Sequence, residues 1–169
     1  VDEVQNLIDK INIFGYHFAS LDIRQDSSIH DKVFHKILTL IFDRKTSDKY
    51  SGMSDDEKIN FISKLNFLNK KTSYKDKDLI NTLGSIEAMK SIQKSNGISG
   101  SHRYIISHNQ SPMNILEVFN MFLFTGWVKP SVDIVPLFET IDDLNVSESV
   151  MEKVYQNKLY KNHLKNRKN

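Results

Sequence analysis

The pattern of apolar and polar positions predicts helices that alternate with a few short strands. Apolar side chains recur every three or four positions, which is the spacing of one helix face, in residues 4–14, 33–41, 59–68, 79–92, 113–123 and 141–154. Short apolar runs typical of buried strands occupy residues 18–23, 104–107 and 134–138. Because helical patterns separate these runs, we expect the strands to pair in parallel through crossover connections.

Capping residues mark where these helices begin and end. Ser54 and Glu57 have the spacing of a capping box, and Pro112 follows Ser111 as a first helical residue. The other expected caps are Gly15 after the first helix, one of residues 26–28 before the second, and Thr140 before the last long one. The helix over 113–123 is apolar nearly all round, so we expect it to be buried.

The segments between these elements are polar. Residues 43–52, 70–77 and 95–101 are expected to be loops or turns, and the basic tail, residues 161–169, is expected to fray. The predicted fold class is helix-rich α/β, with about three short parallel strands and five to seven helices in a single segment, residues 1–169. Eight strand–helix units close a barrel of roughly 250 residues. With about three strands, this chain is expected to form only part of a (β/α) barrel.

Composition narrows the possible functions. With 39% hydrophobic and 26% charged residues, a net charge of +2 and no cysteine, the chain has the composition of a globular protein without disulfides. The charge is too small to indicate nucleic-acid binding. Charged and polar residues interrupt the longest apolar stretch, so we expect no membrane span. No signal peptide is visible and the chain lacks an initiator Met, so we expect a cytoplasmic segment of a longer polypeptide.

Two of the predicted strands end close to charges of opposite sign. Arg24 follows the first and Glu139 follows the third, and α/β proteins place their chemistry at the carboxyl ends of parallel strands. Arg24 is interpreted either as the structural partner of Asp22 or Asp26, or as a clamp for a carboxylate or phosphate. A cation and a carboxylate together suit an anionic substrate held through a metal.

Glu139 also has two interpretations. It is either a carboxylate stabilised at a helix start or a ligand of a divalent cation, since Mg²⁺ favours one or two carboxylates. Asp142 and Asp143 lie in the first turn of the following helix and are expected to be structural. The six histidines lack the spacing of zinc ligands, and no glycine-rich phosphate loop occurs.

Three segments resemble a known family. Residues 22–25 read Asp-Ile-Arg-Gln, residues 136–140 read Pro-Leu-Phe-Glu-Thr, and residues 104–107 are similar to a Tyr-Val-Ile-Ser segment. In this order and at similar spacing, they resemble motifs of phosphoenolpyruvate carboxylases. The resemblance covers essentially the whole chain.

The resemblance implies a cytoplasmic lyase that joins phosphoenolpyruvate to bicarbonate and gives oxaloacetate and phosphate. It implies Mg²⁺ or Mn²⁺ as the cofactor, Glu139 as a metal ligand, Arg24 as a catalytic residue that contacts the anionic substrate, and a homotetrameric parent protein. The family's second metal carboxylate, catalytic histidine and glycine-rich loop lie outside residues 1–169. The isolated chain is therefore expected to be inactive and to bind metal weakly.

Two departures and three alternatives remain open. The family usually has Met-Ala where this chain has His108-Asn109, and His102 is also unusual; no role is predicted for either histidine. The chain can instead be a non-catalytic interaction or regulatory module derived from such a barrel, or part of another Mg²⁺-dependent lyase that forms an enolate. A nucleic-acid-binding role of the basic tail is the weakest alternative.

Overall fold

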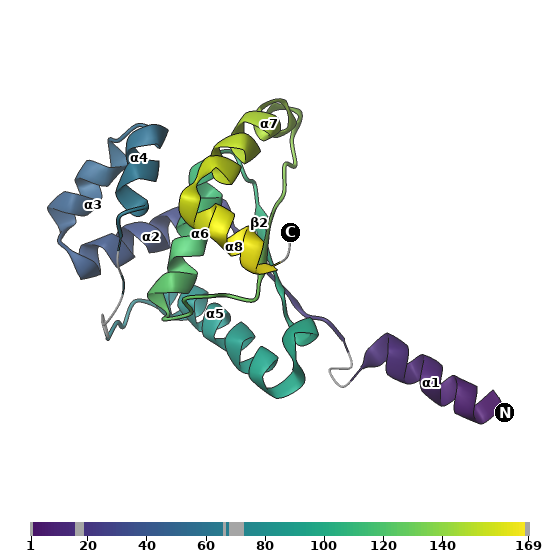
Figure 1. The fold of residues 1–169 in the computed structure, drawn as a ribbon. Helices are drawn as coiled ribbons and strands as arrows, with labels where there is room; N and C mark the ends of the chain where they lie inside the picture. Colours follow the sequence, from purple (N-terminus) through teal and green to yellow (C-terminus); the bar gives the residue numbers. More distant parts are fainter. Residues whose placement is uncertain (1, 16–18, 66, 68–72, 168–169) are drawn as a thin grey trace.

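A three-stranded parallel sheet organises the chain (Figure 1). The computed structural model describes residues 2–15, 19–65, 67 and 73–167. Strands β1 (Asp22–Asp26), β2 (Arg103–Ser107) and β3 (Asp133–Pro136) lie in the order β1-β2-β3. Both neighbouring pairs are parallel. The predicted parallel sheet is therefore confirmed, and the carboxyl ends of its strands share one edge.

Helices make up most of the rest. The described residues form eight α-helices, α1 (Asp2–Phe14), α2 (Ser27–Ile41), α3 (Arg44–Ser51), α4 (Asp55–Ile62), α5 (Lys77–Asn96), α6 (Pro112–Phe124), α7 (Ile141–Gln156) and α8 (Lys158–Arg167), and one short 3₁₀ helix, η1 (Ile98–Gly100). The helix-rich α/β class is confirmed, although there are more helices than the five to seven expected.

The predicted caps fix the ends of these helices. Ser54 and Glu57 form the capping box of α4, and Pro112 opens α6 after the N-cap Ser111. Asp26 caps α2, where its side chain accepts a hydrogen bond from the amide of Ser28 at 2.9 Å. Gly15 follows α1 with a φ of 53°, and Thr140 begins α7.

The strands are shifted from the predicted ranges. β1 begins at Asp22 instead of residue 18, which lies outside the described residues, and β3 ends at Pro136 instead of residue 138. Polar residues open the strands and bind distant partners: Arg103 Nε donates to Asp22 Oδ1 across the sheet at 3.0 Å, and Asp133 accepts from Arg167 of α8. Hydropathy alone does not predict where such a strand begins, because its first residue is polar and is held by a partner elsewhere in the chain.

Two segments predicted as irregular are helical. Residues 44–51 form α3, because Asp43 caps it through the Thr46 amide and Tyr50 is fully buried. Residues 158–167 form α8, in which His163 is buried. Arg167 holds the end of α8 through two bonds to Asp133, at 2.8 and 2.9 Å. Residues 168–169 lie outside the described residues.

The remaining boundaries differ modestly. The helix expected over 59–68 ends at Ile62, and residues 66 and 68 lie outside the described residues. α5 continues to Asn96, into the turn expected over 95–101, and Gly97 ends it with a φ of 84°. In the connector expected over 70–77, residues 70–72 lie outside the described residues, and α5 begins at Lys77, the last residue of that range.

Helix α6 lies at the centre of the core. Ten of its 13 residues are buried, as its apolar sequence predicts, and it contacts α2, α4 and α7. Phe122 of α6 meets Tyr104 of β2 edge to face, with ring centroids 5.5 Å apart. This packing holds the sheet against the helices and fixes the positions of the strand ends.

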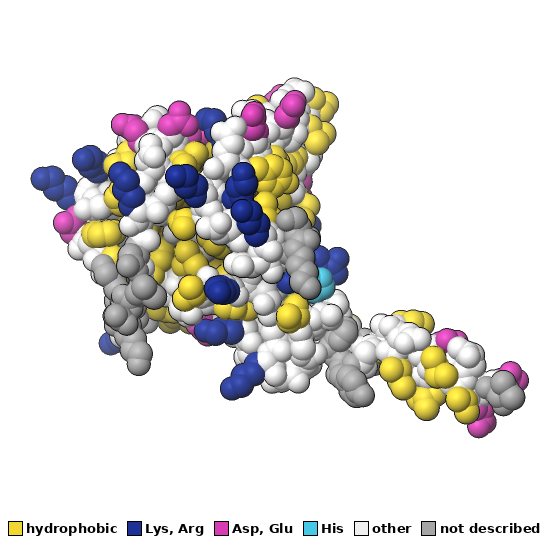
Figure 2. Space-filling model, viewed as in Figure 1, with side chains coloured by type: hydrophobic (Ala, Val, Ile, Leu, Met, Phe, Trp, Pro, Cys, Tyr) yellow, Lys and Arg dark blue, Asp and Glu magenta, His cyan; other side chains and the backbone are white. Residues whose placement is uncertain are grey.

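Helix α1 stands apart from this core. Figure 1 shows it projecting from the rest of the chain, and Figure 2 shows apolar side chains along its surface. None of its described residues is buried. In the described residues, no helix is both long and apolar enough to cross a lipid bilayer.

Candidate functional site at the carboxyl end of the sheet

The site joins side chains from two of the strands and from the segment that follows the third. Arg24 lies in β1, Ser107 is the last residue of β2, and Glu139 lies three residues beyond β3, directly before the N-cap of α7. The strand register pairs Asp26 with Ser107. As a result, residues far apart in the sequence meet at the edge where the strands end.

Arg24 and Glu139 form a direct ion pair. Arg24 Nη2 donates to Glu139 Oε1 at 2.8 Å across 115 residues of sequence. Arg24 Nε also donates to the Ser107 hydroxyl at 2.7 Å. These bonds use two of the five N–H groups of a guanidinium, and the side chain is 57% exposed. Arg24 can therefore contact an anion from solvent while its orientation stays fixed.

The predicted acidic partners of Arg24 bind other residues. Asp22 accepts a hydrogen bond from Arg103 at the opposite end of the sheet, and Asp26 lies 2.8 Å from His108. The structural pairing proposed for Arg24 with either aspartate is therefore wrong. Its partner is instead the other residue singled out by the sequence.

Glu139 is fixed through both of its carboxylate oxygens. Oε1 accepts from Arg24, and Oε2 accepts from the backbone amide of His108 at 3.0 Å. The backbone amides of Glu139 and Thr140 donate to the buried carboxylate of Asp143, at 3.2 and 3.0 Å. Asp143 thus has the structural role expected of it, and it anchors the backbone that carries Glu139.

His108 is the site residue to which sequence reasoning assigned no role. It follows β2 directly, with a φ of 51°, which is uncommon for a residue other than glycine. Its ring Nδ1 lies 2.8 Å from Asp26 Oδ2, and its Nε2 lies 3.6 Å from Glu139 Oε2. One signal in the sequence was its position one residue after a predicted strand. His102 precedes β2 and so lies at the opposite end of that strand.

Hydrogen bonds and neighbouring charges shift the pKa values of two groups in the site. Hydrogen bonds from Ser28 and then from His108 lower the pKa of Asp26 to about 2. The hydrogen bond to Asp26, followed by the negative charge of Glu139, raises the pKa of His108 above its usual value. Arg24 and His108 therefore face the carboxylates of Asp26 and Glu139.

The described residues supply only part of a metal site. No group of three or more His, Asp or Glu side chains within the described ranges is placed to bind one cation. Glu139 contributes carboxylate oxygens, the donors that Mg²⁺ and Mn²⁺ prefer, and an ionised carboxylate has about four lone-pair sites. Glu139 therefore fits one ligand position, and a complete site needs further ligands.

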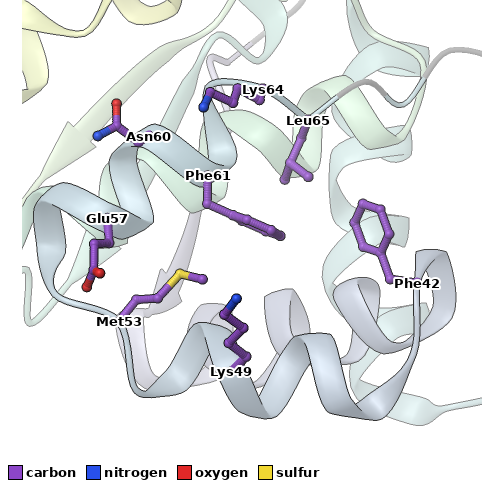
Figure 3. A pocket seen from close by; sticks show the side chains of 8 residues that line it. All are labelled: Phe42, Lys49, Met53, Glu57, Asn60, Phe61, Lys64 and Leu65. Atoms are coloured by element: carbon purple, nitrogen blue, oxygen red, sulfur yellow. The ribbon is translucent and has the colours of Figure 1, made fainter.

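A separate hollow lies between α3 and α4. It has a volume of about 560 Å³ and is lined by eight residues, which do not include Arg24 or Glu139. Figure 3 shows the Phe61 ring extending into it, with Lys49 and Met53 nearby. Its mainly apolar lining offers no pair of acidic groups for acid–base chemistry. The strand-end cluster is therefore the better candidate site.

Comparisons with known proteins match almost the whole chain to a single family. The family model described as phosphoenolpyruvate carboxylase matches residues 1–169. Phosphoenolpyruvate carboxylases of Prochlorococcus marinus strains MIT 9301 and MIT 9312 are 32% and 33% identical to the chain over 171 residues. The enzyme of Trichormus variabilis is 28% identical.

These alignments cover nearly all of this chain but a small part of each relative. They include 95% of the chain and 17% of the length of each Prochlorococcus protein, and 94% and 16% for the Trichormus protein. The match over the whole chain joins the motifs around Arg24 and Glu139 in a single alignment. The chain belongs to the phosphoenolpyruvate carboxylase family.

Proposed function

We propose that the protein containing this chain is a cytoplasmic lyase that carboxylates phosphoenolpyruvate with bicarbonate. A bicarbonate oxygen attacks the phosphorus, the bond from phosphorus to the enol oxygen breaks, and carboxyphosphate and the enolate of pyruvate form. Carbon dioxide released from carboxyphosphate then adds to the enolate carbon, giving oxaloacetate and phosphate. The chain itself is a segment of that enzyme.

The 2.8 Å contact between Arg24 and Glu139 carries this proposal. It places a cation and a carboxylate side by side at the carboxyl end of a parallel sheet, where α/β enzymes build their active sites. Arg24 is proposed as a catalytic residue that binds the anionic groups of the substrate. Its bond to Ser107 orients the guanidinium before the substrate arrives, so that charge developing in the transition state meets a preorganised donor.

Glu139 is proposed as one ligand of Mg²⁺ or Mn²⁺ in the whole protein. A bound cation would supply Lewis-acid stabilisation of the enolate oxygen. The hydrogen bond from the His108 amide orients the carboxylate, and Arg24 balances its charge. Because Mg²⁺ demands near-ideal octahedral coordination, a single carboxylate binds it weakly. We therefore propose that the isolated chain is inactive.

An assay of labelled bicarbonate incorporation tests two statements: that the whole protein is a carboxylase, and that the isolated chain is inactive. We expect the whole protein to fix the label only when phosphoenolpyruvate and Mg²⁺ or Mn²⁺ are present. We expect the 169-residue chain to give no oxaloacetate above its Glu139→Ala variant. Activity of the isolated chain above that control would contradict the second statement. A whole protein that fixes no label would favour a non-catalytic module derived from the barrel.

A further inference from the structure

We infer that His108 supplies a nitrogen ligand to the same cation that Glu139 binds, which makes this site a mixed nitrogen and oxygen site. The inference rests on the proposed role of Glu139 and extends it. Its basis is the arrangement of three side chains at the ends of β1, β2 and β3: Asp26, His108 and Glu139.

The hydrogen bond to Asp26 determines which ring nitrogen is available. His108 Nδ1 lies 2.8 Å from Asp26 Oδ2, and an ionised carboxylate only accepts hydrogen bonds. Nδ1 therefore carries the proton, and Nε2 is the nitrogen that can bind a cation. A histidine that donates its other N–H to a carboxylate is the common arrangement at metal sites. A proton on Nε2 would be released when the cation binds.

The position of Nε2 relative to Glu139 also fits. Nε2 lies 3.6 Å from Glu139 Oε2. Two donors that are each about 2.1 Å from one ion lie about 3.0 to 3.6 Å apart when the angle between them is roughly 90° to 120°. The observed separation lies at the upper end of this range, so the 90° angles of octahedral coordination require the two atoms to move about 0.6 Å closer. One cation can therefore contact both atoms after a small movement of the side chains.

The backbone holds the imidazole in this place. His108 adopts a left-handed conformation with a φ of 51°, which persists only where surrounding contacts fix it. The hydroxyl of Ser27 donates to the His108 carbonyl at 2.7 Å, and the next amide, that of Asn109, donates to the Leu137 carbonyl at 3.0 Å. These contacts come from α2 and from the segment after β3, so they tie His108 to the same frame as Glu139.

A nitrogen ligand changes which cation the site prefers. Carboxylate and water suit Mg²⁺ and Mn²⁺, whereas imidazole favours later transition metals, whose affinities rise from Mn²⁺ through Co²⁺ to Cu²⁺. We therefore expect His108 to strengthen the binding of Co²⁺ and Mn²⁺ more than that of Mg²⁺. This expectation concerns binding, so it can be measured without the reaction.

Pulsed electron paramagnetic resonance of Mn²⁺ bound to the whole protein tests the inference. The wild-type protein should show ¹⁴N modulation that disappears in His108→Asn, since asparagine tolerates a left-handed backbone and lacks the ring nitrogen. Loss of an outer partner of a metal ligand costs about 10–100-fold in affinity, so loss of the ligand should weaken Co²⁺ binding at least tenfold. The affinity for Mg²⁺, measured by its competition with Mn²⁺, should change less.

Three further variants identify the source of any change. His102→Asn, at the opposite end of β2, should leave the modulation and the affinities unchanged. Asp26→Asn keeps both a helix cap and the imidazole, so it should keep the modulation and weaken Mn²⁺ binding less than His108→Asn does. Glu139→Gln should weaken Mn²⁺, Co²⁺ and Mg²⁺ alike. Circular dichroism of each variant confirms folding, and His108→Gln replaces His108→Asn if the latter does not fold.

The outcomes separate this inference from the proposed function. Modulation and Co²⁺ affinity that persist in His108→Asn, with Mn²⁺ binding lost in Glu139→Gln, would overturn the nitrogen ligand and leave the role of Glu139 intact. Mn²⁺ binding that persists in Glu139→Gln would overturn the proposed metal site itself. Loss of the ¹⁴N modulation in His108→Asn, with the modulation retained in His102→Asn and Asp26→Asn, would establish His108 as the ligand.

Discussion

Replacing Arg24 with alanine is expected to lower kcat/KM of the whole protein for phosphoenolpyruvate by about 10²- to 10³-fold, the usual cost of losing one preorganised electrostatic donor. The substitution removes the cation that is proposed to bind the substrate, and it leaves Glu139 without its partner at 2.8 Å. Arg24→Lys should recover only part of the activity, because an ammonium cannot reproduce the planar geometry that reaches both Ser107 and Glu139. Steady-state kinetics with phosphoenolpyruvate as the varied substrate measures both effects.

Arg103→Ala is the matched control for this prediction. Arg103 forms an ion pair with Asp22, at 3.0 Å, and the two side chains are 46% and 36% exposed, against 57% and 30% for Arg24 and Glu139. This second pair lies where β1 and β2 begin, away from the proposed site. Its loss should leave kcat/KM close to that of the wild type, since exposed ion pairs add little to stability. Equal kinetics in the two alanine variants would show that Arg24 is merely structural.

The sequence indicated which residues form the candidate site, but it did not predict the contacts between them. Parallel pairing could be predicted because helical patterns separate the apolar runs, and parallel strands end at one edge. Arg24 and Glu139 were therefore expected near each other. Their direct contact depends on the register of the strands. The observed strands are shifted from the apolar runs that predicted them, so the register did not follow from those runs. A side-chain partner 115 residues away cannot be read from local spacing.

Short polar helices were missed for a related reason. α3 and α8 have few apolar residues, and each is held by one or two large buried side chains, such as Tyr50 and Tyr160. A periodic pattern needs several inward positions before it can be recognised. Tertiary contacts stabilise these helices more than their own sequences do, so their existence follows from the fold. His108 was likewise not assigned to the site, because its contacts with Asp26 and Glu139 depend on the register of the three strands.

Glu117 shows the same limit inside the core. In the sequence it interrupts an apolar stretch, yet in the structure it is 1% exposed and accepts a hydrogen bond from the Tyr50 hydroxyl at 2.7 Å. Burial raises the pKa of the Glu117 carboxyl from 4.5 to about 8, against the smaller opposing effect of the Tyr50 hydrogen bond. A neutral carboxylic acid is thus expected in the core near pH 7.

This buried acid makes stability fall as the pH rises. The folded chain retains the Glu117 proton between the unfolded pKa, near 4.5, and the folded pKa, about 8. Its contribution to the free energy of unfolding is therefore complete below about pH 4.5 and is lost progressively until the pH passes 8. Each pKa unit corresponds to about 1.4 kcal/mol, so the total loss is on the order of a few kcal/mol. Urea unfolding of the 169-residue chain at pH 5 and pH 8.5 measures this loss in the free energy of unfolding.

Glu117→Gln isolates this effect from the other titrating groups. Glutamine resembles the neutral acid in shape and can accept the same bond from Tyr50, so the variant should match the wild type at pH 5. At pH 8.5 it should be more stable, by about 2 kcal/mol or more, because it has no buried charge to form. Tyr50→Phe should instead destabilise the chain by about 1–3 kcal/mol, since it leaves the carboxyl group without its donor. If wild type and Glu117→Gln lost stability in parallel between the two pH values, Glu117 would be ionised in the folded core, and its charge would need a partner other than Tyr50.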